Sequence, residues 1–214
     1  MAKMIDNKPS WKGEGKVWES LSANLPGDNV VYNQREVNGR EYDFCVMAEN
    51  LGLVIIEVKG WDPDKIDVRG VDNIIVDGYD EPQTSPKKQA RAYRFAILNK
   101  IVEKYNASPL VLDMVCYPFI TQEQYVRTKL DIVSEPEYTI FKEDIEDGKK
   151  LNEKIQHLFT LNKFIPHADF SYDLMVRIRK QLEPDFKLSV IDNKNKPYSK
   201  LSIFPNGINE NLIH

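Results

Sequence analysis

The segment Leu53–Lys59, which reads Leu-Val-Ile-Ile-Glu-Val-Lys, constrains the fold of this 214-residue chain more than any other. Successive side chains of a strand point to opposite faces, so both faces of this segment carry apolar residues. Such a strand is covered on both sides. Glu57 and Lys59 end it on one face, and burying these charges is costly unless something compensates them. A metal ion and a phosphate would compensate both.

A second extended segment, Tyr42–Ala48, precedes this strand and is joined to it by a short connection. We predict a hairpin with the three-residue loop Asn50–Gly52, whose glycine is left-handed. Asp43 would then lie across from Lys59, with Glu57 diagonal on the same face, and Cβ atoms roughly 5 to 8 Å apart would let two carboxylates share a cation. Because a loop of even length would put the two carboxylates on opposite faces, the site requires an odd loop.

The remaining sequence predicts alternating helices and strands. Helices are expected at about 13–25, 86–106, 143–161 and 170–183, and strands at 30–37, 41–48, 53–59, 66–68, 73–77, 110–116 and 139–141. Asn38-Gly39 predicts a hairpin, Ser85 caps the long helix that Pro86 begins, and residues 201–205 are a candidate edge strand. The order predicts an α/β fold with a central mixed sheet flanked by helices.

Composition and charge argue against several classes of protein. No apolar run is long enough to span a membrane and the N-terminus lacks a signal-peptide core, so we expect a cytoplasmic protein without membrane contact. Cys45 and Cys116 lie in apolar runs, as reduced core residues do, and no Cys/His spacing matches a zinc site. The net charge of −4 argues against a protein that coats polyanions, but it allows a local basic groove.

Four short motifs follow one another along the chain: Gly13-Glu14, Glu41-Tyr42-Asp43-Phe44, Glu57-Val58-Lys59-Gly60 and Pro86-Lys87-Lys88-Gln89-Ala90. With these motifs, residues 11–125 resemble the nuclease-related domain (NERD) family, a branch of the PD-(D/E)xK nuclease superfamily. Tyr42 stands where the superfamily name implies a proline, a departure that is common in this branch. The resemblance implies a restriction-endonuclease-like core at 1–125 with a helical C-terminal extension. Residues 126–185 would complete or extend that core, and 186–214 would be a polar tail, an edge strand or the lead-in to a missing domain.

The resemblance also implies a divalent-metal site for Mg²⁺ or Mn²⁺. Its implied ligands are Asp43, Glu57, the Val58 carbonyl and Glu14. Lys59 would position or activate the attacking water, and Gln89 would orient that water or contact the phosphate. Oxygen ligands select hard cations, and the pKa of a lysine falls on burial, which suits this role. Glu14 has an alternative role, because an acidic residue in the first turn complements the helix dipole.

Basic residues at the start of the helix at 86–106 are candidate contacts to DNA phosphates: Lys87, Lys88, Arg91 and Arg94. Two lysines at a helix N-terminus indicate an anion nearby. Trp61 is a candidate platform for stacking a base. The alternatives are a solvated charged face for the basic residues and a packing role for the tryptophan.

Two hypotheses from different classes follow. The first is a metal-dependent nuclease hydrolysing DNA phosphodiester bonds, of bacterial or phage origin, which acts alone or as the nuclease domain of a larger nuclease-helicase. The second is a catalytically inactive module on the same fold that binds nucleic acid or docks a protein. The sequence leaves open endo- or exonuclease cleavage, the strandedness of the substrate and the oligomeric state.

Overall fold

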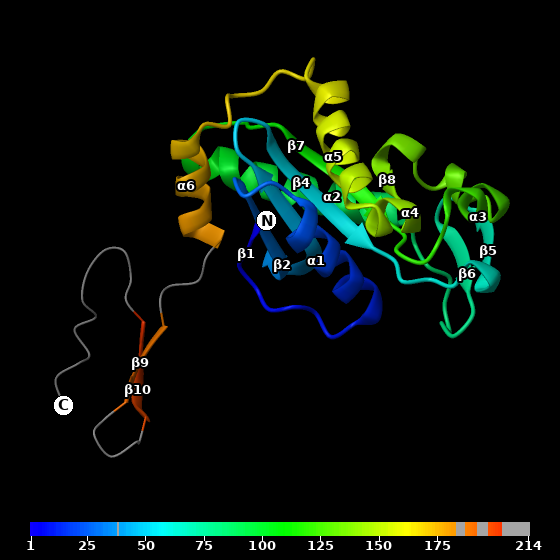
Figure 1. Cartoon of the computed structure of the whole chain (residues 1–214), viewed down its shortest axis with the longest axis horizontal. Coiled ribbons are helices and arrows are strands. Elements are labelled where there is room, and N and C mark those ends of the chain that lie inside the picture. Colours follow the sequence, from blue (N-terminus) through cyan, green and yellow to red (C-terminus); the bar gives the residue numbers. More distant parts are fainter. Residues whose placement is uncertain (38, 183–186, 192–196, 203–214) are drawn as a thin grey trace. The chain divides into compact units, whose positions relative to one another are not determined.

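The computed structural model describes residues 1–37, 39–182, 187–191 and 197–202. The chain divides into two compact units, Met1–Met175 and Val176–His214. The first unit is an α/β fold built on a mixed sheet with helices against it, as the sequence predicts (Figure 1). No helix in the described part of the chain is long and apolar enough to cross a membrane.

The central sheet has six strands in the spatial order β1-β2-β3-β4-β7-β8. Their bounds are Lys3–Met4 (β1), Asn29–Val37 (β2), Arg40–Ala48 (β3), Gly52–Val58 (β4), Val111–Cys116 (β7) and Thr139–Ile140 (β8). Strands β2, β3 and β4 are antiparallel neighbours, whereas β7 is parallel to β4 and β8 is parallel to β7. Two separate pairs are β5 (Ile66–Gly70) with β6 (Asn73–Val76) and β9 (Lys187–Ile191) with β10 (Pro197–Ser202).

The helices lie between and after these strands. Their bounds are Lys12–Asn24 (α1), Pro86–Tyr105 (α2), Gln122–Arg127 (α3), Lys142–Glu146 (α4), Gly148–Asn162 (α5) and Tyr172–Leu182 (α6), with short 3-10 turns at Pro63–Lys65, Leu130–Ile132 and Pro136–Tyr138. The side chain of Ser85 accepts from the Lys88 N–H at 3.3 Å and Pro86 starts α2, as predicted. The helix ends at Asn106, which is left-handed with φ 50°.

Helices cover both faces of the sheet, which explains why β4 is apolar on both sides (Figure 1). One core contains residues from α1, α5 and one face of the strands: Val17, Leu21, Leu151, Ile155, Val54, Ile56, Leu112 and Met114. Asp113 alternates with Leu112 and Met114 in β7, so it points to the other face, where side chains of α2 contact it. Cys45 and Cys116 are buried and unbridged, as predicted.

The β3–β4 loop has an odd length, as predicted, but it begins one residue earlier along the chain than expected. This shift moves the partner of each β3 residue by two positions along β4. Ala48 pairs with Gly52, so the loop is Glu49–Leu51 instead of Asn50–Gly52. Asn50 takes the left-handed position with φ 63°, which leaves Gly52 to begin the strand. Consequently Asp43 lies opposite Glu57, one residue beyond the last pair of the ladder, and not opposite Lys59.

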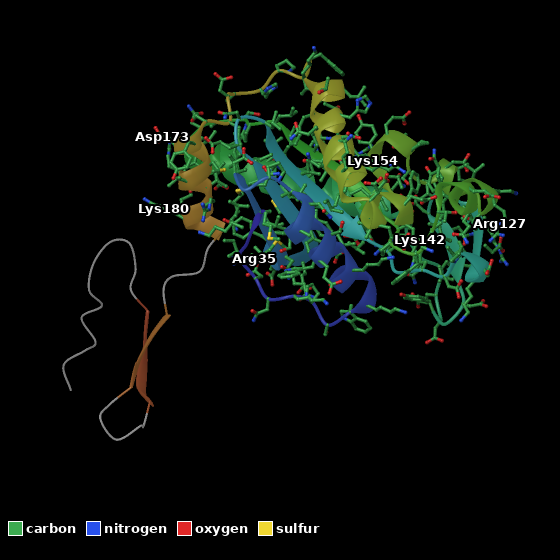
Figure 2. All side chains as sticks on the ribbon, in the orientation of Figure 1. Arg35, Arg127, Lys142, Lys154, Asp173 and Lys180 are labelled. Carbon is green, nitrogen blue, oxygen red and sulfur yellow. The ribbon has the colours of Figure 1, made fainter. Side chains whose placement is uncertain are left out.

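The helix predicted at 143–161 is two helices. Asp147 is extended between α4 and α5, and its side chain accepts from the Lys149 N–H at 3.2 Å. A Cβ on Gly148 would lie 1.8 Å from the side chain of Asn24, so close packing against α1 requires glycine at the break. Figure 2 labels Lys154 of α5, whose ammonium lies 2.7 Å from Asp144 of α4 and ties the two pieces together.

Three other differences concern single elements. Strand β1 and helix α3 are not predicted, although Thr121 and Gln124 form the capping box that begins α3. Leu201 and Ser202 of the predicted edge strand pair with β9 and not with the central sheet, whereas 203–205 lie outside the described residues. Val37 pairs with Arg40 across the predicted Asn38-Gly39 turn, in which Asn38 itself lies outside the described residues.

Gly52 offers a test of the register. Its φ is 142°, and a Cβ there would lie 2.1 Å from the Leu110 carbonyl oxygen. We expect Gly52→Ala to lower the free energy of unfolding by at least about 1–3 kcal/mol, measured by urea denaturation, because the backbone strain alone is of this size. Gly70→Ala is the control, since its nearest neighbour would be at an ordinary 3.9 Å. Equal stability of the two variants would contradict the close approach.

Candidate functional site

A pocket of about 490 Å³ lies where the ladder between β3 and β4 ends. Its described lining is Trp11, Lys12, Gly13, Glu14, Asp43, Glu57, Val58, Lys59, Gly60, Trp61, Tyr79 and Phe119. Three of the four motif segments noted in the sequence therefore converge on one pocket. The fourth, at the start of α2, lies outside this lining.

Asp43 is oriented by the backbone of the neighbouring strand. Its Oδ2 accepts a hydrogen bond of 2.6 Å from the Val58 N–H, and continuation of the pairing places it opposite Glu57. Side chains directly opposite each other in an antiparallel pair share one face, with Cβ atoms about 4.5–5.5 Å apart. The two carboxylates therefore enter the pocket from adjacent strands.

Glu57 and Lys59 form an ion pair inside the pocket. The Lys59 Nζ donates to Glu57 Oε1 at 2.7 Å, and the two side chains are only 20% and 6% exposed. Since residues two apart on a strand share a face, the strand itself brings this pair together. The pair places a positive charge beside two negative ones.

Glu14 reaches the same pocket from α1, and the glycine that precedes it lets the helix approach the end of β4 closely. A Cβ on Gly13 would lie 3.2 Å from the Gly60 Cα, a contact closer than most side chains allow. This explains why a glycine precedes Glu14 in the motif. Glu14 Oε2 in turn accepts from the Gln34 side-chain amide at 3.0 Å.

The sequence analysis missed Gln34. This residue of β2 has φ 51° and lies at the position opposite Asp43 in the β2–β3 pairing. The sequence does contain a signal for Gln34. The predicted two-residue turn at 38–39 puts Val37 opposite Arg40, and counting back along the two strands puts Gln34 opposite Asp43. The pocket residues Trp11, Tyr79 and Phe119 were also missed, and no local pattern marks them.

The carboxylates of the pocket raise one another's pKa values. Burial, followed by the charge of Asp43, raises the pKa of Glu14 to about 7. Burial, followed by the charge of Glu57, raises the pKa of Asp43. Burial also raises the pKa of Glu57, although Lys59 opposes this shift. The three carboxylates of the pocket outnumber its two lysines, Lys12 and Lys59, and a cation would relieve the excess negative charge.

The carboxylate oxygens in the pocket suit a hard divalent cation that takes only a few of its ligands from the protein. Among the described residues, no three His, Cys, Asp or Glu side chains form a group close enough to hold a metal ion. Two carboxylates nevertheless suit Mg²⁺, which is commonly held by one or two carboxylates while it keeps waters and binds substrate phosphate. The oxygens of Asp43 and Glu57 are donors of this kind, and the residues present fit such an ion.

Gln89 lies outside the described lining of the pocket. Its amide donates to Thr84 Oγ1 at 3.0 Å, and its buried Oε1 accepts no hydrogen bond from the described residues. In the structure Gln89 thus contacts the segment that precedes α2, and its role beside the attacking water stays a prediction.

Lys87 is buried and cannot serve as a phosphate contact. Its ammonium lies 2.9 Å from Asp113 Oδ2 and 3.9 Å from the centre of the Tyr138 ring, and burial lowers its pKa. The sequence predicted an anion near the two lysines that begin α2. For Lys87 this anion is the carboxylate of Asp113 in the same chain. Arg94 shares this partner, with 3.0 Å to Asp113 Oδ1.

The other candidate DNA contacts differ in exposure. Lys88 is exposed and pairs with Asp72, and Arg91 is exposed on α2. Trp61 is only 3% exposed and packs 5.9 Å from Tyr117, so its ring is not free to stack on a base. Its packing role is the one that the structure supports.

The α/β fold, with a six-stranded mixed sheet flanked by helices, is consistent with a nuclease-like fold. The family model described as nuclease-related domain matches residues 9–118, and the chain belongs to this NERD family. The family suggests a nuclease-related function. No curated protein and no solved structure matches the chain.

The raised pKa values predict how stability depends on pH without metal. The folded chain holds protons that the unfolded chain releases, so stability should fall as pH rises from 4.5 toward about 7. We expect a lower melting temperature at pH about 7.5 than at about 5.5 in EDTA, and a rise when Mg²⁺ or Mn²⁺ is added at the higher pH. Of the neighbouring charges, Glu41 strengthens the effect and Lys59 weakens it.

Asp43→Asn is the control for this experiment. It removes one of the three carboxylates, so the difference in melting temperature between the two pH values should shrink, as should the response to metal. An unchanged pH dependence would contradict the assignment to this pocket.

The buried Asp113 cluster predicts a large effect on stability. Asp113→Ala leaves Lys87 and Arg94 without their shared partner, and we expect the free energy of unfolding to fall by about 3–5 kcal/mol in urea denaturation. Asp67→Ala is the control, because its pair with Arg69 is about 60% exposed on both sides and should contribute less than about 1 kcal/mol. A small effect for Asp113→Ala would contradict a structural role for Lys87.

Proposed function

We propose that the chain is a divalent-metal-dependent nuclease that hydrolyses phosphodiester bonds of DNA. The observation that carries the proposal is the convergence of Asp43, Glu57 and Lys59 in one pocket at the ends of two adjacent strands. Membership of the nuclease-related family supports it. The suggestion that a helicase in the same or another chain is a partner rests on the family resemblance alone.

Asp43 and Glu57 are the residues that would hold Mg²⁺ or Mn²⁺, with the Val58 carbonyl as a further oxygen donor, whereas Glu14 lines the same pocket without forming a three-carboxylate group with them. When bound, such an ion lowers the pKa of a coordinated water and screens the phosphoryl oxygens. The Val58 N–H holds Asp43 by one oxygen, which fixes the direction of the carboxylate before any ligand enters. Preorganisation of this kind reduces the reorganisation that binding requires.

Lys59 supplies the positive charge that these carboxylates lack. Its ammonium is held at 2.7 Å from Glu57 and donates hydrogen bonds, so it can position water and offset charge on a phosphate beside the acidic pair. An arginine would present a larger planar group at the same point. Gln89 has no part in the proposal, since it lies outside the described pocket lining.

An inactive binding module is the second candidate, and one observation favours it. The Glu57–Lys59 pair already satisfies both charges within the folded chain, as a purely structural ion pair does. In that case nucleic-acid or protein binding would need no metal and would be indifferent to Asp43. Binding without cleavage in the experiment below would support this candidate.

The test is cleavage of plasmid and single-stranded DNA by the purified chain. We expect cleavage with Mg²⁺ or Mn²⁺ and none in EDTA. Lys59→Met should reduce the rate by about 10²–10⁴-fold, the usual contribution of a positioned proton-transfer group, and Asp43→Asn should abolish metal-dependent cleavage. Melting temperatures should show that both variants are folded.

Lys149→Met is the matched control, because the side chain of this lysine is 85% exposed and lies outside the described lining of the pocket. Its rate should equal that of the unaltered chain. Cleavage that survives both Lys59→Met and Asp43→Asn would assign the activity to another site or to a contaminant.

A further inference from the structure

The mouth of the candidate site carries aromatic side chains that are not explained by packing. Trp11 is 71% exposed and Tyr79 is 55% exposed, although both line the pocket, and Phe119 lies beside them in its wall. Large aromatic side chains are normally stabilised by burial. Those at the mouth of a polar pocket are available to a ligand.

Trp11 is also an unfavourable residue for its local position. It is the N-cap of α1, where Ser, Thr, Asp or Asn would accept from a first-turn N–H, and its side chain makes no such bond. Trp11 therefore stabilises the helix neither by capping nor by burial. This points to a role outside the folding of the chain.

A second pocket of about 370 Å³ continues from the first. Both are lined by Trp11, Lys12 and Phe119, and the second adds Lys8 and Lys16. The Lys12 and Lys16 ammonium groups lie 5.6 and 5.8 Å from the centre of the Phe119 ring. Aromatic side chains and lysines therefore lie side by side along the two adjoining pockets, which together lead away from the acidic residues.

The charges on this path are accessible to phosphates. Lys12 is exposed and forms no ion pair with the described residues. Lys8 pairs with Glu19 in an exposed pair, whereas Lys16 is half-buried, pairs with Glu146 at 3.0 Å and lies 3.4 Å from the Pro118 carbonyl oxygen. Exposed pairs contribute little, so a phosphate can replace the carboxylate at small cost.

We propose that Trp11, Phe119 and the lysines of the second pocket form a subsite for single-stranded DNA. An unpaired base stacks on the Trp11 ring while Lys12 and Lys16 contact the flanking phosphates. Stacking needs a base whose face is open, which an intact duplex does not offer. The choice of DNA rests on the proposed function, but the subsite itself does not depend on hydrolysis.

Binding is measured by fluorescence anisotropy in EDTA with a labelled oligothymidylate of about twelve nucleotides, within the range of known single-strand sites, and with a duplex of equal length. We expect the single strand to bind more tightly. Trp11→Ala should weaken its binding at least about fivefold, and Trp11→Phe should recover part of the loss. Indole fluorescence should be quenched on binding in the unaltered chain and much less in Trp11→Ala.

The salt dependence of single-strand binding distinguishes the contribution of base stacking from that of phosphate contacts. Lys12→Ala should reduce the slope of log K against log salt concentration by about 0.7, the value for one phosphate contact on a single strand, whereas Trp11→Ala should leave the slope unchanged. The controls are Phe164→Ala and Lys149→Ala. These residues are 79% exposed and 85% exposed in the side chain, respectively, and neither is in the described lining of the two pockets.

Three outcomes would overturn the subsite. The first is no single-strand binding at low salt, and the second is single-strand binding that is unchanged in Trp11→Ala. The third is a duplex that binds as tightly as the single strand and loses the same affinity in Trp11→Ala. Metal-dependent cleavage with unaltered binding by Trp11→Ala would overturn the subsite and leave the nuclease proposal standing. Trp11-dependent binding without any cleavage would support the subsite and overturn the nuclease.

Discussion

The antiparallel pairing of β3 with β4 through a loop of three residues is the constraint on which the rest of the site depends. An odd loop keeps Asp43 on the same face as Glu57, and the left-handed Asn50 makes that loop possible without strain at Gly52. Because β4 is covered by helices on both faces, the register cannot slip without placing charges in the core. The geometry of the acidic pair is thus held by the packing of the whole sheet.

The pocket concentrates negative charge that the chain itself does not neutralise. Three carboxylates share the pocket with two lysines, and burial makes the repulsion between the carboxylates effective, as the raised pKa values of Glu14 and Asp43 indicate. The third carboxylate comes from α1, which approaches the end of β4 closely at Gly13. Such mutual repulsion is the arrangement that the proposed cation would relieve.

Much of the site could be predicted from particular residues. Glu57 and Lys59 share a face because strand residues alternate, and the odd loop adds Asp43, so local geometry was enough for these three. Lys87 could not be assigned in this way. Its partner Asp113 is 26 residues away on another strand, and only the packing of α2 on the sheet shows that the lysine is buried. The sequence also left open whether Trp61 packs or stacks on a base, because its 3% exposure does not follow from a motif.

The sequence by itself determined the α/β class, most of the helix and strand order and the identity of the acidic pair with its lysine. These follow from periodicity and turn residues, which act over a few positions. The tertiary structure decided which charged residues enter the pocket, which are buried elsewhere, and where Glu14 and Trp11 lie relative to the acidic pair. Those outcomes depend on the close approach of elements distant along the chain, and no local pattern encodes such distances.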